Sequence, residues 1–173
     1  MNEVLEAIKT RRSIRAFTDK KISREDLELL TDAARYAPSG LNRQSWQFTV
    51  VQNTQMLEKL AKVIREELNR GADYNFYGAN ALILASNDRG NPLGMQDCAC
   101  ALENIFLAAH SLGLGSVWIN QLNGICDVPS IRAVLSELDV PESHLVYGLA
   151  ALGYPAENGR PANKKDDVVE WVL

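Results

Sequence analysis

The chain has 173 residues, of which 46% are hydrophobic and 23% are charged, and its formal net charge at pH 7 is −4. Such a length and composition are most simply those of one soluble globular domain, residues 1–173. The acidic balance argues against a nucleic-acid partner, because affinity for a phosphate backbone requires a broad basic face. The apolar stretches are far shorter than the roughly 20 residues of a membrane-spanning helix, so no membrane partner is expected.

Three cysteines, Cys98, Cys100 and Cys126, cannot all pair with one another. A secreted disulfide scaffold carries a larger, even number, and the N-terminal sequence lacks the basic-then-apolar order of a secretory signal. We therefore expect a cytoplasmic protein. Cys98 and Cys100 would point to different faces of a helix, so we expect neither a metal site nor a redox pair and interpret all three as small buried residues.

Two helices are predicted before any strand. The first begins after Asn2, a suitable N-cap, and the second begins at Ser23 and ends before Pro38. The apolar side chains of the first helix share one face: Val4, Leu5 and Ile8.

The following segments alternate between strands and helices. The β-branched and aromatic run at 46–52 predicts a strand, and the stretch 54–71 predicts an amphipathic helix that Gly71 ends. A continuous apolar run at 81–86 predicts a buried strand. The inward residues expected in the helix are Leu57, Leu60, Ile64 and Leu68.

The second half centres on a helix at 98–115 that is apolar on almost every side. Such a helix is packed by several neighbours, either other helices or a partner subunit. A strand at 116–120, a short helix at 130–138 and a strand at 144–153 follow it. One sheet covered by helices is therefore expected, although two helices before the first strand exclude a simple doubly wound order.

Side chains that perform difficult chemistry alone are scarce. His110 and His144 are the two histidines, neither has metal-site spacing, and we interpret both as structural. The sequence has no G-x-S-x-G, H-E-x-x-H, C-x-x-C, G-x-G-x-x-G or P-loop motif. An organic cofactor would supply what the side chains lack.

Three polar segments stand out instead. "RRSIR" at 11–15 offers guanidinium forks suited to a phosphate, "APSGLNRQSWQF" at 37–48 offers amides and hydroxyls able to bind the edge of a heteroaromatic ring, and "NGRPANKKDD" at 158–167 is basic. Taken singly, such segments are more often solvated surface or plain loops.

Together with the central helix and "ALGYP" at 151–155, these segments resemble, in order and over essentially the whole chain, the FMN-dependent nitroreductase family. The resemblance implies an α+β fold with three layers, α-β-α, around a central mixed, mostly antiparallel sheet. It also implies an intertwined homodimer in which each FMN contacts both chains. The C-terminal segment 168–173 would then wrap over the partner subunit.

The resemblance also implies the residues that bind FMN. The phosphate and ribityl chain would contact the first motif, with a late lysine as the matching basic contact and Arg160 as its competitor. The second motif would reach the flavin of the other subunit, and the segment after the central helix would run beside the ring. Arg12 or Arg15 would stabilise reduced flavin near N1 and O2. The implied cofactor-binding residues are Arg11, Arg12, Ser13, Arg15, Pro38, Ser39, Asn42, Gln44, Gly115, Ser116, Ile119, Gly153, Lys164 and Lys165.

The implied activity is that of an oxidoreductase with a ping-pong mechanism. NADH or NADPH would give hydride to flavin N5 and leave, and a nitroaromatic, quinone or similar small molecule would then accept it. Flavin N5 carries this chemistry, so no catalytic side chain is predicted. The alternative is a flavin-binding storage or sensor protein of the same fold, since the stretch between Leu68 and Ala81, which covers the substrate pocket in larger members, is brief.

Overall fold

A computed structural model describes residues 2–165 and 167–173 of the chain. Its helices are α1 (Glu3–Thr10), α2 (Arg24–Arg35), α3 (Thr54–Glu67), α4 (Gly94–Ser111) and α5 (Pro129–Glu137). Its strands are β1 (Trp46–Val51), β2 (Ala81–Asp88), β3 (Gly115–Ile119) and β4 (His144–Gly153). Two short 3-10 turns lie at Gly40–Asn42 and Phe76–Gly78.

The strands form one sheet in the order β1-β2-β4-β3, and each neighbouring pair is antiparallel. A parallel component enters where Ser13 bridges Ser116 at the outer side of β3. This arrangement confirms the predicted α+β fold with a mostly antiparallel sheet. The basic segment therefore lies along the β3 edge of the sheet.

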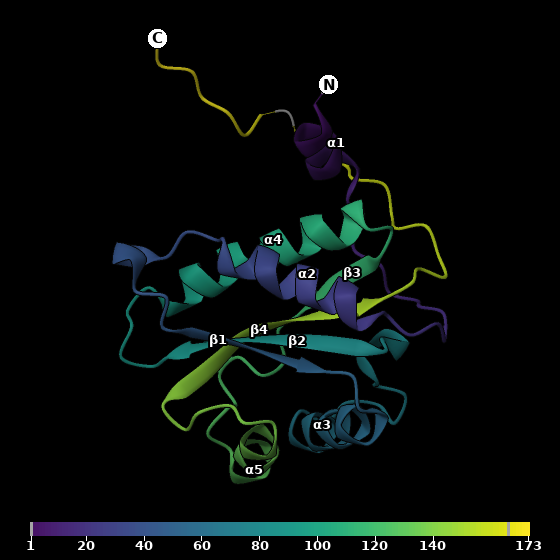
Figure 1. The fold of residues 1–173 in the computed structure, drawn as a ribbon, viewed down its shortest axis with the longest axis vertical. Coiled ribbons are helices and arrows are strands. Elements are labelled where there is room, and N and C mark those ends of the chain that lie inside the picture. The colour runs from purple at the N-terminus through teal and green to yellow at the C-terminus, as the bar shows by residue number, and fades with distance from the viewer. Residues whose placement is uncertain (1, 166) are drawn as a thin grey trace.

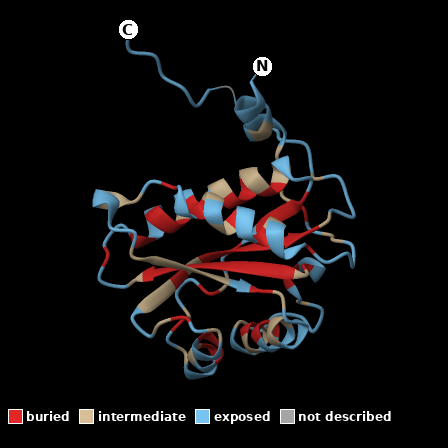
Figure 2. Ribbon diagram, viewed as in Figure 1, coloured by how far each residue is buried: buried red, intermediate tan, exposed pale blue. Residues whose placement is uncertain are grey.

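Helices cover both faces of the sheet and make three layers (Figure 1). One core lies between the sheet and α3 with α5, and a second lies between the sheet and α2 with α4. Because both faces are covered, residues 81–87 of β2 are all buried (Figure 2). This explains why that strand reads as a continuous apolar run instead of an alternating one.

Two helix ends differ from the predicted ones. The third helix ends at Glu67, not at Gly71, because Asn69 takes the left-handed conformation with φ 48° and the Arg70 amide returns to the Arg65 carbonyl. The central helix begins at Gly94, four residues before the predicted start.

The cysteine prediction was wrong at one position. Cys98 and Cys126 are buried, but Cys100 is exposed on the outer side of α4. Residues 98 and 100 are two apart on a helix, so they cannot share its buried face.

Two apolar surfaces of the chain remain uncovered near the N- and C-termini, which lie beyond α4 at the same side of the molecule (Figure 1). In α1, which Asn2 caps by accepting from the Leu5 amide at 2.9 Å, the predicted apolar face is exposed. The C-terminal side chains are also exposed, Trp171 to 75% and Val172 to 94%. Within residues 2–165 and 167–173, no other part of the chain buries either surface.

Candidate functional site

The basic segment after α1 is held between β3 and the chain that follows β4. The Ile14 amide donates to the Ser116 carbonyl oxygen at 3.0 Å, and Phe17 forms a bridge with Pro155. Residues 11–17 thus cross the ends of both strands, and their position is set by the backbone.

Two predicted glycines make this close approach possible. A Cβ atom at Gly115 would lie 3.0 Å from the side chain of Ile14, and one at Gly153 would lie 2.8 Å from the ring of Phe17. Any larger residue would push the basic segment off the sheet. The two glycines therefore position the segment regardless of any direct contact with a ligand.

A pocket of about 240 Å³ opens beside this segment, and six of the residues that line it are basic. The first and third polar segments, one near each end of the chain, meet at this pocket. The second polar segment, residues 37–48, does not line it. In an acidic protein, this concentration of positive charge is suited to an anion with several oxygen atoms. The lining residues are Ile8, Lys9, Arg11, Arg12, Ser13, Arg15, Arg160, Ala162 and Lys164.

The basic side chains are held in different ways. Arg12 Nη1 donates to the carbonyl oxygens of Lys9 and Arg11, both at 2.7 Å, so its guanidinium caps the end of α1. Arg11 Nε lies 3.8 Å from a carboxylate oxygen of Glu103, a contact too long and too exposed to neutralise it strongly. Lys165 does not line the pocket, whereas Lys164 and Arg160 do.

The predicted amide-rich loop, residues 38–44, lies elsewhere, at the N-terminal end of α4. The Gly40 amide donates to Asp97 Oδ1 at 2.8 Å, and Gln44 Nε2 donates to Asn42 Oδ1 at 2.9 Å. The Gln44 amide donates to Ser39 Oγ at 3.2 Å. Pro38, Asn42 and Gln44 are exposed and Ser39 is half-buried, so the loop presents polar groups to the surroundings.

The loop and the basic pocket stand at diagonally opposite corners of the sheet. Trp46, just after the loop, pairs with Asn87, whereas Ser116, beside the pocket, pairs with Leu152 in the row of Ala81. Six residues along β2 and three strand spacings separate Trp46 from Ser116 by about 25 Å. A single small ligand cannot touch both corners of one chain.

The remaining predicted contacts are mostly buried. Ser116 and Ile119 are each 2% exposed, and Ile119 packs into the core beneath α3 and α5. The Ile119 side chain therefore faces away from the pocket, and only its backbone is available to a ligand on the other side of the sheet.

The family assignment rests on most of the length of the chain. The model of the Nitroreductase family matches residues 8–154, from the basic segment to the end of β4. The chain belongs to the Nitroreductase family. This confirms the resemblance that the sequence motifs indicate.

Individual members of the Nitroreductase family are similar over nearly the full chain. A crystal structure of a nitroreductase with bound FMN from Bacteroides fragilis is 43% identical, with all of both chains covered and a TM-score of 0.92. A Methanothermobacter thermautotrophicus protein, provisionally named NADH dehydrogenase/NAD(P)H nitroreductase, is 39% identical over 165 residues, 90% of this chain and 79% of its own. The FMN reductase [NAD(P)H] of Bacillus subtilis is 26% identical over 182 residues, 91% of this chain and 68% of its own.

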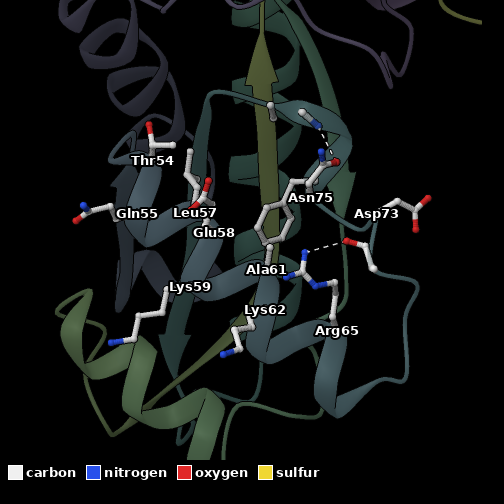
Figure 3. A pocket seen from close by; sticks show the side chains of 14 residues that line it. Thr54, Gln55, Leu57, Glu58, Lys59, Ala61, Lys62, Arg65, Asp73 and Asn75 are labelled. Atoms are coloured by element: carbon white, nitrogen blue, oxygen red, sulfur yellow. Dashed lines mark hydrogen bonds between the residues drawn. The ribbon is translucent and has the colours of Figure 1, made fainter.

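A larger pocket of about 790 Å³ lies between α3 and residues 72–79 (Figure 3). None of the predicted flavin contacts lines it. Its cations already have partners, since Lys59 Nζ lies 2.6 Å from Glu137 and Arg65 Nη1 donates to the carbonyl oxygens of Ala72 and Tyr74. With its mixed, paired charges, this pocket is a weaker candidate for an anion than the basic one.

Several residues of the site escape prediction from the sequence. Glu157 Oε1 accepts from the Arg15 amide at 2.8 Å, and the Arg15 guanidinium lies 5.9 Å from the centre of the Tyr77 ring. Asp97 anchors the amide-rich loop from inside α4. In the sequence, Asp97 is marked only as the single carboxylate at the start of a mostly apolar helix.

Among the described residues, no group of three histidine, cysteine, aspartate or glutamate side chains is arranged to hold a metal ion. Within the same part of the chain, none of the helices has the length and apolar character to span a membrane.

Proposed function

We propose that this chain is an NAD(P)H-dependent FMN oxidoreductase that acts as a homodimer on small electron acceptors such as nitroaromatics or quinones. The observation that carries the proposal is the basic pocket, where both ends of an acidic chain bring six cations together. Membership of the Nitroreductase family and the FMN bound in a relative of 43% identity support it.

The residues at the pocket fit the phosphate of FMN. Guanidinium groups bind phosphate oxygens in pairs, and Arg11, Arg160 and Ser13 all line the pocket. Lys164 would add a compact charge. The nearby carboxylate Glu103 is exposed and 3.8 Å from Arg11, so it leaves most of the positive potential in place.

Bound FMN would supply the hydride chemistry, accepting hydride from NADH or NADPH at N5 and delivering it to the acceptor. The protein would bind the flavin, orient it toward the donor and the acceptor, and shield it from water. Arg12 contributes a charge whose place is fixed by two carbonyl oxygens, and a fixed positive charge favours an anionic ligand state without reorganisation. Donor and acceptor would occupy the same opening in turn, which is a ping-pong order.

A second copy of the chain is needed to complete the site. The amide-rich loop stands about 25 Å from the basic pocket within one chain, so Ser39, Asn42 and Gln44 can reach a flavin only across an interface. A two-fold dimer would bring the loop of each chain to the pocket of the other and create two equal sites. The uncovered apolar residues of α1 and of 168–173 supply surface for such an interface.

The visible absorption spectrum of the purified protein tests this proposal. We expect flavin bands in the protein as isolated or after addition of FMN, and their loss when NADH or NADPH is added without oxygen. A protein that takes up no FMN, or a bound flavin that neither nucleotide reduces, would contradict the proposal.

Turnover with a quinone separates the enzyme from a flavin storage or sensor protein. Rapid multiple turnover is expected of the enzyme, whereas a storage protein would be reduced once and then stall.

The three unpaired cysteines suit a reducing compartment, and we place the enzyme in the cytoplasm.

A further inference from the structure

One carboxylate is buried at the start of α4 and belongs to no predicted contact. Asp97 is only 4% exposed, and both of its oxygens accept hydrogen bonds: Oδ1 from the Gly40 amide at 2.8 Å and Oδ2 from Asn91 Nδ2 at 3.0 Å. Burying a charge is costly unless hydrogen bonds compensate for the lost water. The two partners of Asp97 therefore satisfy both of its buried oxygens.

Asn91 extends the contact to the other end of the loop. Its Oδ1 accepts from Arg43 Nη1 at 3.2 Å, and its Nδ2 also donates to Ser45 Oγ at 3.1 Å. Asn91 is itself only 6% exposed. Through Gly40 on one side and Asn91 on the other, Asp97 thus holds both ends of the loop 39–45.

The loop itself has a conformation that needs such support. Leu41, Asn42 and Gln44 have φ values of 55°, 54° and 48°, in the left-handed region that residues other than glycine seldom adopt. Conformations of this kind persist only where the surrounding structure determines them. Gly40 adds a steric constraint, because its Cα packs against the side chain of Leu93, where a Cβ atom would overlap.

We propose that Asp97 is a positioning residue for the flavin site. By fixing Gly40 and Asn91, it sets the loop geometry in which Asn42 and Gln44 present their side-chain amides to the FMN of the partner subunit. Asp97 does not touch the cofactor. This inference rests on the proposed function, because it requires that the loop contact a flavin.

Exchanging the carboxylate of Asp97 with the amide of Asn91 tests whether Asp97 positions the loop. In Asp97→Asn, the new amide nitrogen faces one of two donors, so one hydrogen bond is lost. In Asn91→Asp, two carboxylates face each other. In the double variant, Asn at 97 accepts from Gly40 and donates to Asp at 91, so the contacts that join positions 40, 97 and 91 return with the charge moved from position 97 to position 91. The Ser45 hydroxyl, which accepts from Asn91 and donates to Asn87 in the wild type, would turn to donate to the new carboxylate.

The expected readouts are FMN affinity, measured by quenching of FMN fluorescence, and the melting temperature of the FMN-free dimer. Each single variant should raise the FMN dissociation constant about 10- to 100-fold, the usual effect of losing a hydrogen bond to a charged group. The double variant should return it to within about threefold of the wild type. The exposed neighbour substitution Gln96→Ala should leave the constant unchanged.

Variants of the loop itself keep the two proposals distinct. If Asn42→Ala weakens FMN binding but Asp97→Asn does not, the flavin site stands and the positioning role of Asp97 is overturned. If the wild type binds no FMN, the proposed function fails first. If Asp97→Asn unfolds the chain, or if the double variant binds FMN no better than the single ones, Asp97 supports the fold and not the loop geometry, and the inference is also overturned.

Discussion

Gly159 lies directly against the side chain of Arg12. A Cβ atom at Gly159 would overlap Arg12 Cβ and lie 3.1 Å from Arg12 Cγ and 3.3 Å from Ile14 Cδ1. This contact joins the chain after β4 to the basic segment after α1. The distance between the two groups of cations therefore depends on the absence of a side chain at position 159.

Gly159→Ala should weaken FMN binding. The added methyl group would push the segment that carries Arg160 and Lys164 away from Arg12, because overpacking of this kind costs about 1–3 kcal/mol. We expect the FMN dissociation constant, measured by fluorescence quenching, to rise about tenfold, which corresponds to about 1.4 kcal/mol. The exposed neighbour substitution Asn158→Ala is the control, and an equal effect of both variants would refute the explanation.

Arg11→Ala tests the first motif directly. Loss of one charge-assisted hydrogen bond to a phosphate should weaken FMN retention by about 1.5–3 kcal/mol. Equilibrium dialysis of FMN against both proteins measures the difference. Arg35→Ala removes a more exposed arginine on α2, where Arg35 pairs with Asp32, and should change nothing. Unchanged FMN occupancy in Arg11→Ala would show that the phosphate lies elsewhere.

The two late lysines form a matched pair. Lys164 lines the basic pocket and Lys165 does not, although the two are neighbours with the same charge. Lys164→Ala should therefore raise the FMN dissociation constant about tenfold, and Lys165→Ala less than about threefold, because screening weakens an exposed charge at longer range. Titration with FMN at physiological ionic strength measures both dissociation constants. A larger effect at Lys165 would assign the phosphate contact to that residue.

The local elements of the fold follow from local signals. Asn2 and Ser23 cap α1 and α2 with the hydrogen bonds that their side chains predict, and the apolar run 81–86 forms the buried strand β2. Each of these predictions depends on residues that are close together in the sequence or on one repeating pattern of apolar residues. The basic pocket was also predictable in part, because Arg11 and Lys164 belong to motifs that together identify the family.

Features that depend on contacts between distant segments could not be predicted in this way. The separation of Gln44 from Ser13 results from strand order and register, which no local pattern encodes. The buried role of Asp97 depends on Gly40, 57 positions away in the chain. Gly159 carries no signal either, because its small size matters only where Arg12 approaches it.

Deletion of residues 168–173 should loosen the proposed dimer. These residues are exposed in the single chain, with Leu173 fully accessible and Trp171 at 75%, and burying such side chains against a partner contributes about 1.5–3 kcal/mol each before ordering costs. Sedimentation equilibrium should show a dimer dissociation constant at least about 100-fold higher.

A full-length variant with Trp171→Ser and Leu173→Ser is the control for chain length. It should weaken the dimer in the same direction, whereas Glu170→Gln should not. If the truncated protein sediments and melts like the full chain, the segment contributes nothing to the interface.

His144 should make the stability of the fold depend on pH. Its Nδ1 lies 3.1 Å from Ser86 Oγ, and Ser86 is fully buried. Burial lowers the pKa of His144 below 6.5, since it disfavours the charged imidazolium, and the nearby Asp88 opposes this only in part. The His144 side chain is only half-buried, so we expect a modest effect.

The sign of that effect follows from proton linkage. Between the lowered pKa of the folded chain and the ordinary value near 6.5, the unfolded chain binds more protons, so the free energy of unfolding rises with pH across this window. The stabilisation is complete above about pH 6.5 and is lost as the pH falls through the window to the folded pKa. Urea unfolding of the FMN-free protein, at one fixed protein concentration and a series of pH values, measures how the free energy of unfolding changes with pH. His144→Gln, which keeps a side-chain amide able to reach Ser86, should flatten this dependence, and a variant with the wild-type slope would assign the pH dependence to another group.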